Sequence, residues 1–468
     1  MKLNVMETIE KERITVKRSA DLGEKHSDKN PDLGKKQIVV IGGGFAGLNF
    51  IQKIAKNKSY HITLVDKNNY NYFTPLLYQV ATGFLEPSSI SYPFRKLFQE
   101  SNISFRMGEL EEVDTNLNRI YLSDRSYLSY DFLVFAAGSQ PNFFSNKTVQ
   151  KNAIALKGID DALFMRNHLV RIFEEASIER DPVEKRKLLT IVIAGGGPTG
   201  VEVAGMLAEL KKHILHKEYP EIDVNEIKLF VVDGAPYLLA PMSEKTHDAA
   251  KTILSDLGIT VVLNTLVTGY ENDEVKLANG GVIGTKTLIW AAGVTAPGIT
   301  GIKSSSVGKG GRMITDSFHR VKDYQNIFAI GDISIQMHEA AYPQGHPQLA
   351  QPAIHQGRSL AKNFIRIAKG KSPVPFKYFD RGEMAIIGRT HALVDLFKHK
   401  VHFGGILGLL NWLFIHVISL VNYNNIIKTL YTWVVAYITC DQPLRMIFRS
   451  SPKVNEKKEE VRQVEKAA

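Results

Sequence analysis

The feature that most constrains the fold is a glycine-rich turn between two apolar runs near the start of the chain. Residues 37–41 form a short run rich in β-branched side chains, which is typical of a buried parallel strand. The next residues read G-x-G-x-x-G, helical periodicity follows, and a second apolar run ends at Asp66. That acid comes about 20 residues after the last glycine, which is the spacing of a dinucleotide-binding fold. The order of strand, glycine turn, helix, strand and acid therefore predicts such a fold.

The glycine turn suits a pyrophosphate. Gly42 allows the tight turn, Gly44 lets the backbone approach the ligand, and Gly47 lets helix and strand pack closely. The helix that follows offers free N–H groups and the positive end of its dipole to the phosphates. Asp66 is expected to accept hydrogen bonds from the ribose. We expect the first ligand on Gly42, Gly43, Gly44, Phe45, Ala46 and Gly47.

The same order of features recurs in the second third of the chain. Residues 189–194 predict a strand, a second G-x-G-x-x-G leads into a predicted helix over 201–211, and a further strand ends at Asp233. A later strand ends in Ala-Ala-Gly at Gly293, which suits close approach of the backbone to a ligand. The second ligand is expected on Gly195, Gly197, Pro198, Thr199, Gly200 and Asp233. Because that carboxylate repels a 2′-phosphate and no arginine follows it, we expect a dinucleotide without a 2′-phosphate at this site.

Composition and net charge limit the kinds of partner and bound group that we expect for the chain. The chain has 468 residues, enough for more than one domain, and a net charge of +10 with a pI of about 9.2. Such a charge suits an anionic membrane surface or nucleic acid, but we find no nucleic-acid-binding module and favour the membrane. The single cysteine, Cys440, excludes an internal disulfide, a redox-active cysteine pair and a cysteine-rich zinc site, and we expect no metal site.

The two ends of the chain differ in character from its middle. Residues 1–35 are polar and contain acids but no apolar segment, which predicts a mobile arm rather than a secretory signal or a transit peptide. Residues 384–396 predict strands, and 404–421 and 426–438 are two nearly continuous apolar stretches. A span needs about 20 apolar residues, so the first stretch is borderline. Tryptophan and tyrosine near lysine and arginine favour helices that lie in the membrane interface; a spanning helix and core or dimer helices are the alternatives.

Two tandem folds with Gly331-Asp332 downstream resemble the flavoproteins with two dinucleotide-binding domains. In that family the first site holds FAD, and the second, inserted within the FAD domain, holds NAD(P)H. Disulfide reductases and sulfide:quinone oxidoreductases of the family use cysteines that this chain lacks. Soluble ferredoxin or rubredoxin reductases and type II NADH:quinone oxidoreductases remain as candidates.

Finer motifs favour the second candidate. Residues 75–83 resemble the early loop of the type II enzymes, 197–202 resemble their second glycine motif with its acid, and 350–357 match their A-Q-x-A-x-x-Q-G quinone motif at every fixed position. The aromatic and basic C-terminal region resembles their membrane-docking helices. The chain is identified as a member of the type II (single-subunit, non-proton-pumping) NADH:quinone oxidoreductases. Asp233 departs from the pattern, since glutamate is commoner there.

The resemblance implies further contacts for a non-covalently bound FAD. Lys67 and the backbone at Leu110 flank the adenosine end. Gly331 permits a close approach, and Asp332 accepts from ribityl hydroxyls. The helix that begins near Ala350 points its positive end at the flavin, where it stabilises negative charge.

The resemblance also implies the quinone chemistry. Glu202 lies near the nicotinamide and the flavin and handles a proton when quinone is reduced; the alternative is a glutamate favoured only by the helix dipole. Gln351, Gln356 and Gln79 line the quinone site, and His355 is a secondary candidate. Both electrons pass through one flavin, so no metal is required.

The expected architecture is α/β, with two tandem Rossmann-like dinucleotide-binding domains and a C-terminal membrane-docking unit. The expected boundaries are a mobile arm at 1–35, the FAD domain at 36–155 and 299–371, the NADH domain at 156–298, the docking region at 372–450 and a charged tail at 451–468. We expect a peripheral enzyme on the cytoplasmic face of the cell membrane that contacts lipid through 404–438, with a homodimer left open. A soluble NADH-dependent ferredoxin or rubredoxin-type reductase and a flavin-bearing signalling protein are the alternative functions.

Overall fold

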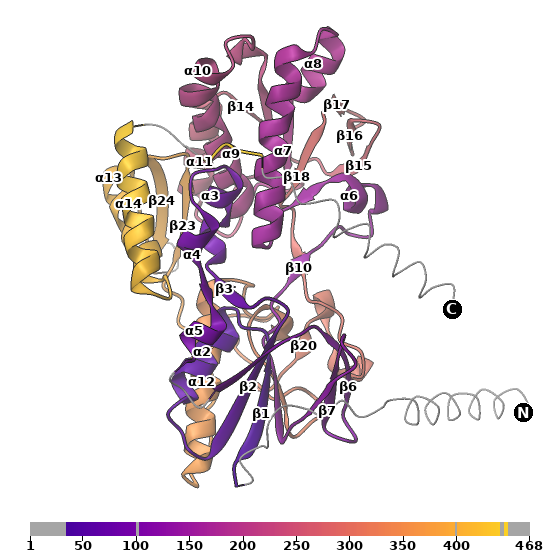
Figure 1. Cartoon of the computed structure of the whole chain (residues 1–468), viewed down its shortest axis with the longest axis vertical. Helices are drawn as coiled ribbons and strands as arrows, with labels where there is room; N and C mark the ends of the chain where they lie inside the picture. Colours follow the sequence, from indigo (N-terminus) through magenta and orange to yellow (C-terminus); the bar gives the residue numbers. More distant parts are fainter. Residues whose placement is uncertain (1–33, 100–102, 398–399, 440–443, 448–468) are drawn as a thin grey trace, which may run out of the picture. The chain divides into compact units, whose positions relative to one another are not determined.

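The computed structural model describes residues 34–99, 103–397, 400–439 and 444–447. The chain divides into two compact units, each made of three stretches of sequence (Figure 1). Unit 1 takes residues 1–71, 93–139 and 295–378, and unit 2 takes 72–92, 140–294 and 379–468. Almost all of the predicted arm, Cys440 and the predicted tail lie outside the described residues. The domain boundaries inferred from the sequence stay predictions.

Unit 1 is organised around a five-stranded parallel sheet in the order β21-β9-β1-β2-β5. Its strands are β1 (Lys36–Ile41), β2 (Tyr60–Asp66), β5 (Ile103–Met107), β9 (Phe132–Phe135) and β21 (Ile327–Ala329). The apolar run predicted as the first strand is β1, and its last four residues are buried. The unit also contains the antiparallel sheet β6 (Leu110–Asp114), β7 (Arg119–Leu122) and β8 (Tyr127–Ser129), the pair β20 (Met313–Ile314) and β22 (Ser334–Ile335), and the short helix α5 (Phe94–Leu97).

Two helices of unit 1 pack directly on each other, α2 (Phe45–Ile54) and α12 (Ala350–Ala368) (Figure 1). Gly357 makes the close approach sterically feasible, because a Cβ at this position would lie only 2.3 Å from the carbonyl oxygen of Ala46. The final glycine of the A-Q-x-A-x-x-Q-G motif thus has a packing reason of its own.

Unit 2 repeats the same plan with the parallel order β11-β18-β12-β13-β14. The strands are β11 (Ile154–Ala155), β12 (Thr190–Ala194), β13 (Lys228–Val232), β14 (Ile259–Val262) and β18 (Thr287–Trp290). The longer helices are α7 (Ile159–Ile178), α8 (Pro182–Leu189), α9 (Pro198–Leu210) and α11 (Glu244–Asp256). Shorter elements are α3 (Leu77–Ala81), α4 (Pro87–Ile90), α6 (Lys147–Asn152), α10 (His216–Glu218) and the antiparallel sheet β15 (Val267–Glu271), β16 (Glu274–Leu277) and β17 (Val282–Gly284). The predicted α/β fold with two Rossmann-like domains is confirmed.

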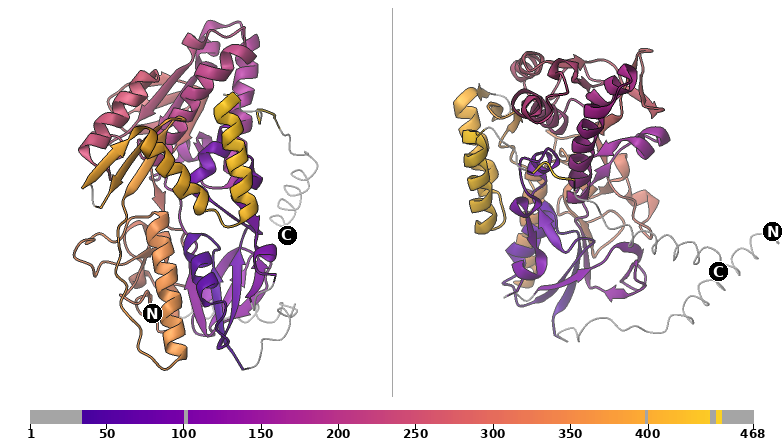
Figure 2. Two further views of the ribbon diagram at one scale, coloured as in Figure 1. Left: turned by 90° about the vertical axis from the view of Figure 1, so that its left-hand side faces the viewer. Right: turned by 45° about the horizontal axis from the view of Figure 1, so that its top comes forward.

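The C-terminal part of unit 2 is an antiparallel sheet followed by two helices (Figure 2). The strands β23 (Glu383–Ile387), β24 (His391–Leu396) and β25 (Val401–Gly404) confirm the predicted β-rich segment. Helix α13 (Gly405–Ile418) packs on β24, and α14 (Tyr423–Thr439) packs on α13 and α4. Within the described residues, no helix combines the length and the apolar character that a membrane crossing requires.

Two local expectations were wrong. The sequence of residues 102–114 predicts one strand, but its described part forms two strands. The chain leaves the β5 pairing with β2 at Gly108 and enters the separate sheet of β6. The helix expected over 201–211 begins at Pro198, since proline suits the first helical turn, and a π-helical turn at Lys211–Leu215 extends it. Glu202 therefore lies a full turn inside α9.

Candidate functional site

The first glycine turn is fixed by two close backbone approaches. Gly42 has φ +100°, and a Cβ on it would lie 2.4 Å from the carbonyl oxygen of Ala136, just past the end of β9. A Cβ on Gly47 would lie 2.0 Å from the carbonyl oxygen of Gly42. Gly44, in contrast, would meet nothing within 4 Å. The turn is packed against the sheet on one side and open where a ligand would approach.

The start of α2 and the end of β2 meet at this turn. Helix α2 has no acid in its first turn, so its positive end is not neutralised by the helix itself. The carboxylate of Asp66 accepts a hydrogen bond from the backbone N–H of Gly43 at 2.7 Å and from that of Asn68 at 2.8 Å. Burial raises the pKa of Asp66, and these two hydrogen bonds oppose the rise. Asp66 therefore shapes the turn, and its contact with a ribose stays a prediction, as do the contacts of Lys67 and Leu110.

A third strand end joins the first site. The hydroxyl of Ser139 donates to Asp332 at 2.7 Å, and the backbone N–H of Gly331 donates to the Oε1 of Gln356 at 2.7 Å. Gln356 lies on α12, is only 2% exposed, and so holds the Gly331 turn in place. A role for its side chain in lining a quinone site stays a prediction, as it does for Gln351 at the start of the same helix.

The second glycine turn reproduces the geometry of the first. Gly195 has φ +114°, and its Cβ would lie 2.5 Å from the carbonyl oxygen of Ala291. A Cβ on Gly200 would lie 1.9 Å from the carbonyl oxygen of Gly195, whereas Gly197 would meet nothing within 4 Å. Two stretches that are far apart in the sequence thus form the same turn, which is closely packed on one side and open on the other. This is expected if both bind a dinucleotide.

The acid of the second fold also contacts its own turn. Asp233 accepts from the backbone N–H of Gly196 and, at 2.7 Å, from that of Ala235. Pro198 and Thr199 are exposed at the start of α9, and the carbonyl oxygen of Gly293 accepts from the N–H of Asn142 at 3.0 Å. The predicted residues of the second site therefore lie together in unit 2.

Glu202 is a buried acid in the middle of α9, with 9% of its surface exposed. Burial raises its pKa well above the usual range of a glutamate, and a hydrogen bond from the backbone of Ile386 on β23 counters part of that rise. Strand β23 reaches α9 because of Gly205, whose Cβ would lie 2.2 Å from the backbone nitrogen of Gly388. The C-terminal sheet, which the sequence placed in a separate docking region, thus takes part in burying the predicted catalytic acid.

Gln79 belongs to a buried group that sequence reasoning did not find. Its Nε2 donates to the hydroxyl of Tyr78 at 3.1 Å, and its Oε1 accepts from the indole N–H of Trp433 at 2.8 Å. The unusual aromatic content of residues 70–78 was the available signal. Gln79 lies in unit 2, whereas Gln351 and Gln356 lie in unit 1, and their shared part in a quinone site stays a prediction.

The two turns fit the cofactors that the sequence implies. Each offers an open face beside Gly44 or Gly197, a helix N-terminus and a carboxylate at the end of the next strand, which is the donor and acceptor set of a dinucleotide. Within the described ranges, no group of three or more histidine, cysteine or acidic side chains is arranged to hold a metal ion.

Comparison with known proteins decides the family. The chain matches the family of pyridine nucleotide-disulphide oxidoreductases over residues 36–357. It is 34% identical over 422 residues to the type II NADH:quinone oxidoreductase NdhA of Mycobacterium tuberculosis, covering 86% of this chain and 88% of that protein. The chain belongs to the type II NADH:quinone oxidoreductases. The family predicted from the sequence motifs is thereby confirmed.

Two further comparisons place this type II oxidoreductase among its relatives. A type II NADH:quinone oxidoreductase of Staphylococcus aureus is 30% identical over 379 residues, covering 78% of this chain and 91% of that protein. The structure of NDH2 from Plasmodium falciparum in complex with NADH superposes with a TM-score of 0.80 at 22% identity, covering 89% of this chain and 100% of that one. At 22% identity, the similarity to the Plasmodium falciparum structure supports a shared fold and nothing more.

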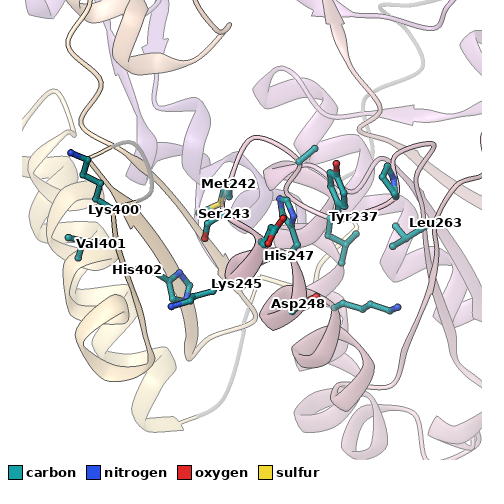
Figure 3. Close-up of a pocket in the computed structure, with 15 residues that line it drawn as sticks. Tyr237, Met242, Ser243, Lys245, His247, Asp248, Leu263, Lys400, Val401 and His402 are labelled. Atoms are coloured by element: carbon teal, nitrogen blue, oxygen red, sulfur yellow. The ribbon is translucent and has the colours of Figure 1, made fainter. Parts of the chain in front are cut away.

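Unit 2 of this type II oxidoreductase also contains a cavity of about 1050 Å³ beside the start of α11 (Figure 3). Its lining includes Tyr237 and His247, whose rings stack with centroids 4.4 Å apart, and His402 from β25. Lysines and acids both line it, so its charge is mixed. None of the predicted site residues lines this cavity, and we assign it no part in the chemistry.

The buried acid of α9 makes stability depend on pH in a defined direction. A glutamate in an unfolded chain loses its proton near pH 4.3, whereas folded Glu202 keeps its proton to a higher pH. The stability contributed by the protonated form is present below the unfolded value and is lost as pH rises through the raised folded value. The loss amounts to about 1.4 kcal/mol for each unit of pKa shift.

We therefore expect Glu202→Gln, which has no proton to lose, to gain stability relative to the wild type as pH rises from about 5 to about 9. Thermal unfolding midpoints of both proteins across that range measure the effect. Glu111→Gln, at an exposed glutamate, is the control and is expected to follow the wild type. A constant difference between Glu202→Gln and the wild type at all pH values would contradict a raised pKa at Glu202.

Proposed function

We propose that the protein oxidises NADH and passes both electrons, through non-covalently bound FAD, to a membrane quinone without pumping protons. The observation that carries this proposal is the pair of matching glycine turns, each open on one side and each flanked by a strand-end carboxylate, in a chain of this family. When bound, FAD supplies a carrier that accepts two electrons at once and returns them to a quinone.

The residues of the chain divide the binding between them. Gly42, Gly44 and the start of α2 would hold the FAD pyrophosphate, and Asp332 would meet the ribityl chain. Gly195, Gly197 and the start of α9 would hold NADH. Asp233 would accept from the ribose and repel a 2′-phosphate, which selects NADH over NADPH.

Quinone reduction needs protons as well as electrons. NADH, one further proton and a quinone yield NAD⁺ and a quinol, so one proton must come from the protein or solvent. Glu202 suits this task because burial holds its proton to a higher pH than that of an exposed carboxylate. We assign Glu202 the role of proton donor to the reduced quinone.

The C-terminal helices support a membrane partner. Large apolar side chains on α13 and α14 point outward, with exposed fractions from 37% to 83%, while Trp412 and Trp433 face inward. The exposed set is Ile406, Leu407, Leu410, Phe414, Ile415, Ile418, Tyr423, Ile427, Leu430, Tyr431, Val434 and Ile438. We call this set the apolar face. Such a face is unusual in contact with water and suits helices lying in a lipid interface, on the cytoplasmic side of the cell membrane where NADH is available. A soluble redox partner would leave the apolar face without a role.

Rapid-reaction measurements on Glu202→Gln test the proton donor. We expect NADH to reduce the bound flavin within about twofold of the wild-type rate, and a short-chain quinone to reoxidise it about 100-fold more slowly, the lower range for loss of a general acid. Stopped-flow absorbance under anaerobic conditions separates the two half-reactions.

Glu209→Gln is the matched control for this experiment. Glu209 lies on the same helix and is equally buried, but it pairs with His213 at 3.3 Å. Both half-reactions of this variant should stay near the wild-type rates. Equal slowing of the two half-reactions in Glu202→Gln would contradict its assignment, and a wild-type protein that reduces no quinone would contradict the function itself.

Vesicle binding tests the apolar face. We expect the triple variant Ile406→Glu, Leu407→Glu and Ile438→Glu to stay in the supernatant when the wild type sediments with phosphatidylglycerol-containing vesicles, because three charges replace outward apolar side chains. Reduction of water-soluble ferricyanide by NADH should be retained.

Ile178→Glu, at a residue 79% exposed on α7, is the control and should sediment like the wild type. A triple variant that still sediments would contradict lipid contact through this face. The apolar face would instead belong to a contact between two copies of the chain if two results were found together. The wild type would not sediment with vesicles and would elute as a dimer, and the triple variant would elute as a monomer.

A further inference from the structure

We propose that Trp433, on the helix with the apolar face, is a positioning residue for the quinone half-reaction: it fixes the amide of Gln79, and that amide orients the hydroxyl of Tyr78, on a helix that packs against the helix of Glu202. The inference rests on the proposed function, because it concerns how the proton donor is set up. It adds three residues from α3 and α14 to the acid on α9.

The first step is the orientation of a buried amide. The indole N–H of Trp433 donates to the Oε1 of Gln79 at 2.8 Å. Gln79 is 4% exposed and Trp433 is 3% exposed, so water does not compete freely for this bond. Because an indole nitrogen can only donate, a flipped amide would set its NH₂ group against another donor. Trp433 therefore holds the Gln79 amide in one of its two orientations.

The second step is the orientation of a buried hydroxyl. With Oε1 held by Trp433, the Nε2 of Gln79 donates to the hydroxyl oxygen of Tyr78 at 3.1 Å. A phenol both donates and accepts, so its oxygen receives the amide N–H and its own proton is directed elsewhere. A flipped amide would present Oε1 instead and would draw the Tyr78 proton toward itself.

The third step brings in the acid. Helices α3 and α9 pack against each other (Figure 1). Tyr78 is buried, and after that burial the charge of Glu202 is the largest contribution that raises its pKa. The phenol and the carboxyl group are thus close enough to influence each other. The direction of the Tyr78 O–H dipole, which Gln79 sets, therefore alters the electrostatic potential at Glu202 and with it how readily that acid gives up its proton.

Tyr78 and Glu202 also have other titratable and charged neighbours. Tyr437 of α14 interacts with Tyr78, and it in turn interacts with Arg389, next to β23, and with Glu209 of α9. The backbone of Ile386 on β23 supplies the hydrogen bond to Glu202. The Trp433–Gln79–Tyr78 chain is therefore one of several influences on this acid. It reaches the helix of the apolar face through hydrogen bonds, as Arg389 does through its bonds with Ala436 and Tyr437.

Trp433→Phe tests the proposal, since it keeps an aromatic ring and removes only the N–H donor and part of the ring. We expect flavin reduction by NADH to stay within about twofold of the wild-type rate, and reoxidation by a short-chain quinone to slow about fivefold, as expected for one buried neutral hydrogen bond. We also expect the fall of the quinone rate at alkaline pH to move, because the Tyr78 O–H dipole that acts on Glu202 is no longer held in one orientation.

Trp412→Phe is the matched control. Trp412 is 1% exposed on α13, and its indole nitrogen has no hydrogen-bond partner among the described residues. The same loss of ring volume there should leave the quinone rate and its pH profile unchanged. Equal slowing in both tryptophan variants would reduce Trp433 to a packing role and overturn the proposal.

Tyr78→Phe tests the same hydroxyl directly, because it removes a single oxygen atom. It should also move the alkaline limb, and the double variant with Trp433→Phe should be no slower than Tyr78→Phe alone, because both act through one hydroxyl. Additive effects would overturn the proposal, as would a Trp433→Phe enzyme with the wild-type quinone rate and pH profile. A wild type that reduces ferricyanide but no quinone contradicts the proposed function, whereas these outcomes contradict only the role of Trp433.

Discussion

Contact between backbone atoms at the two glycine turns is the constraint on which the rest of the structure depends. In each turn the sixth residue of the motif approaches the carbonyl of the first so closely that a Cβ would lie 2.0 Å away at Gly47 and 1.9 Å away at Gly200. Side chains larger than hydrogen are therefore excluded at these positions. The contact joins the start of a helix to the end of a strand, and it leaves the free N–H groups of the helix facing the open side of the turn.

Helix α9 connects the second glycine turn to the predicted catalytic acid. Its first turn forms part of the second nucleotide turn, its next turn carries Glu202, and Gly205 then allows β23 to close over it. The same helix thus forms part of the proposed nucleotide site at its N-terminus and carries a buried acid one turn further along. The acid owes its raised pKa to burial, and α9 packs there against both the C-terminal sheet and α3.

Local patterns explain what could be predicted from the sequence and what could not. The strands before Gly42 and Gly195 were predictable because apolar runs, glycine spacing and a terminal acid are all local signals. The break at Gly108 was missed because a strand that changes sheets keeps the same residue preferences on both sides of the break. Gln356 was expected to face a ligand, yet its side chain also holds Gly331, a contact that depends on tertiary structure. The bond from Trp433 to Gln79 joins distant stretches of chain, and no periodicity in either one indicates it.

The central claim is that one chain binds FAD and NADH on two matching turns and moves electrons between them. Anaerobic titration of the purified protein with NADH, followed by the visible absorbance of the flavin, tests it most directly. The account predicts a yellow protein that releases one FAD per chain on denaturation and whose visible band is bleached by one equivalent of NADH. A colourless protein, or a yellow one whose band NADH leaves unchanged, would contradict it.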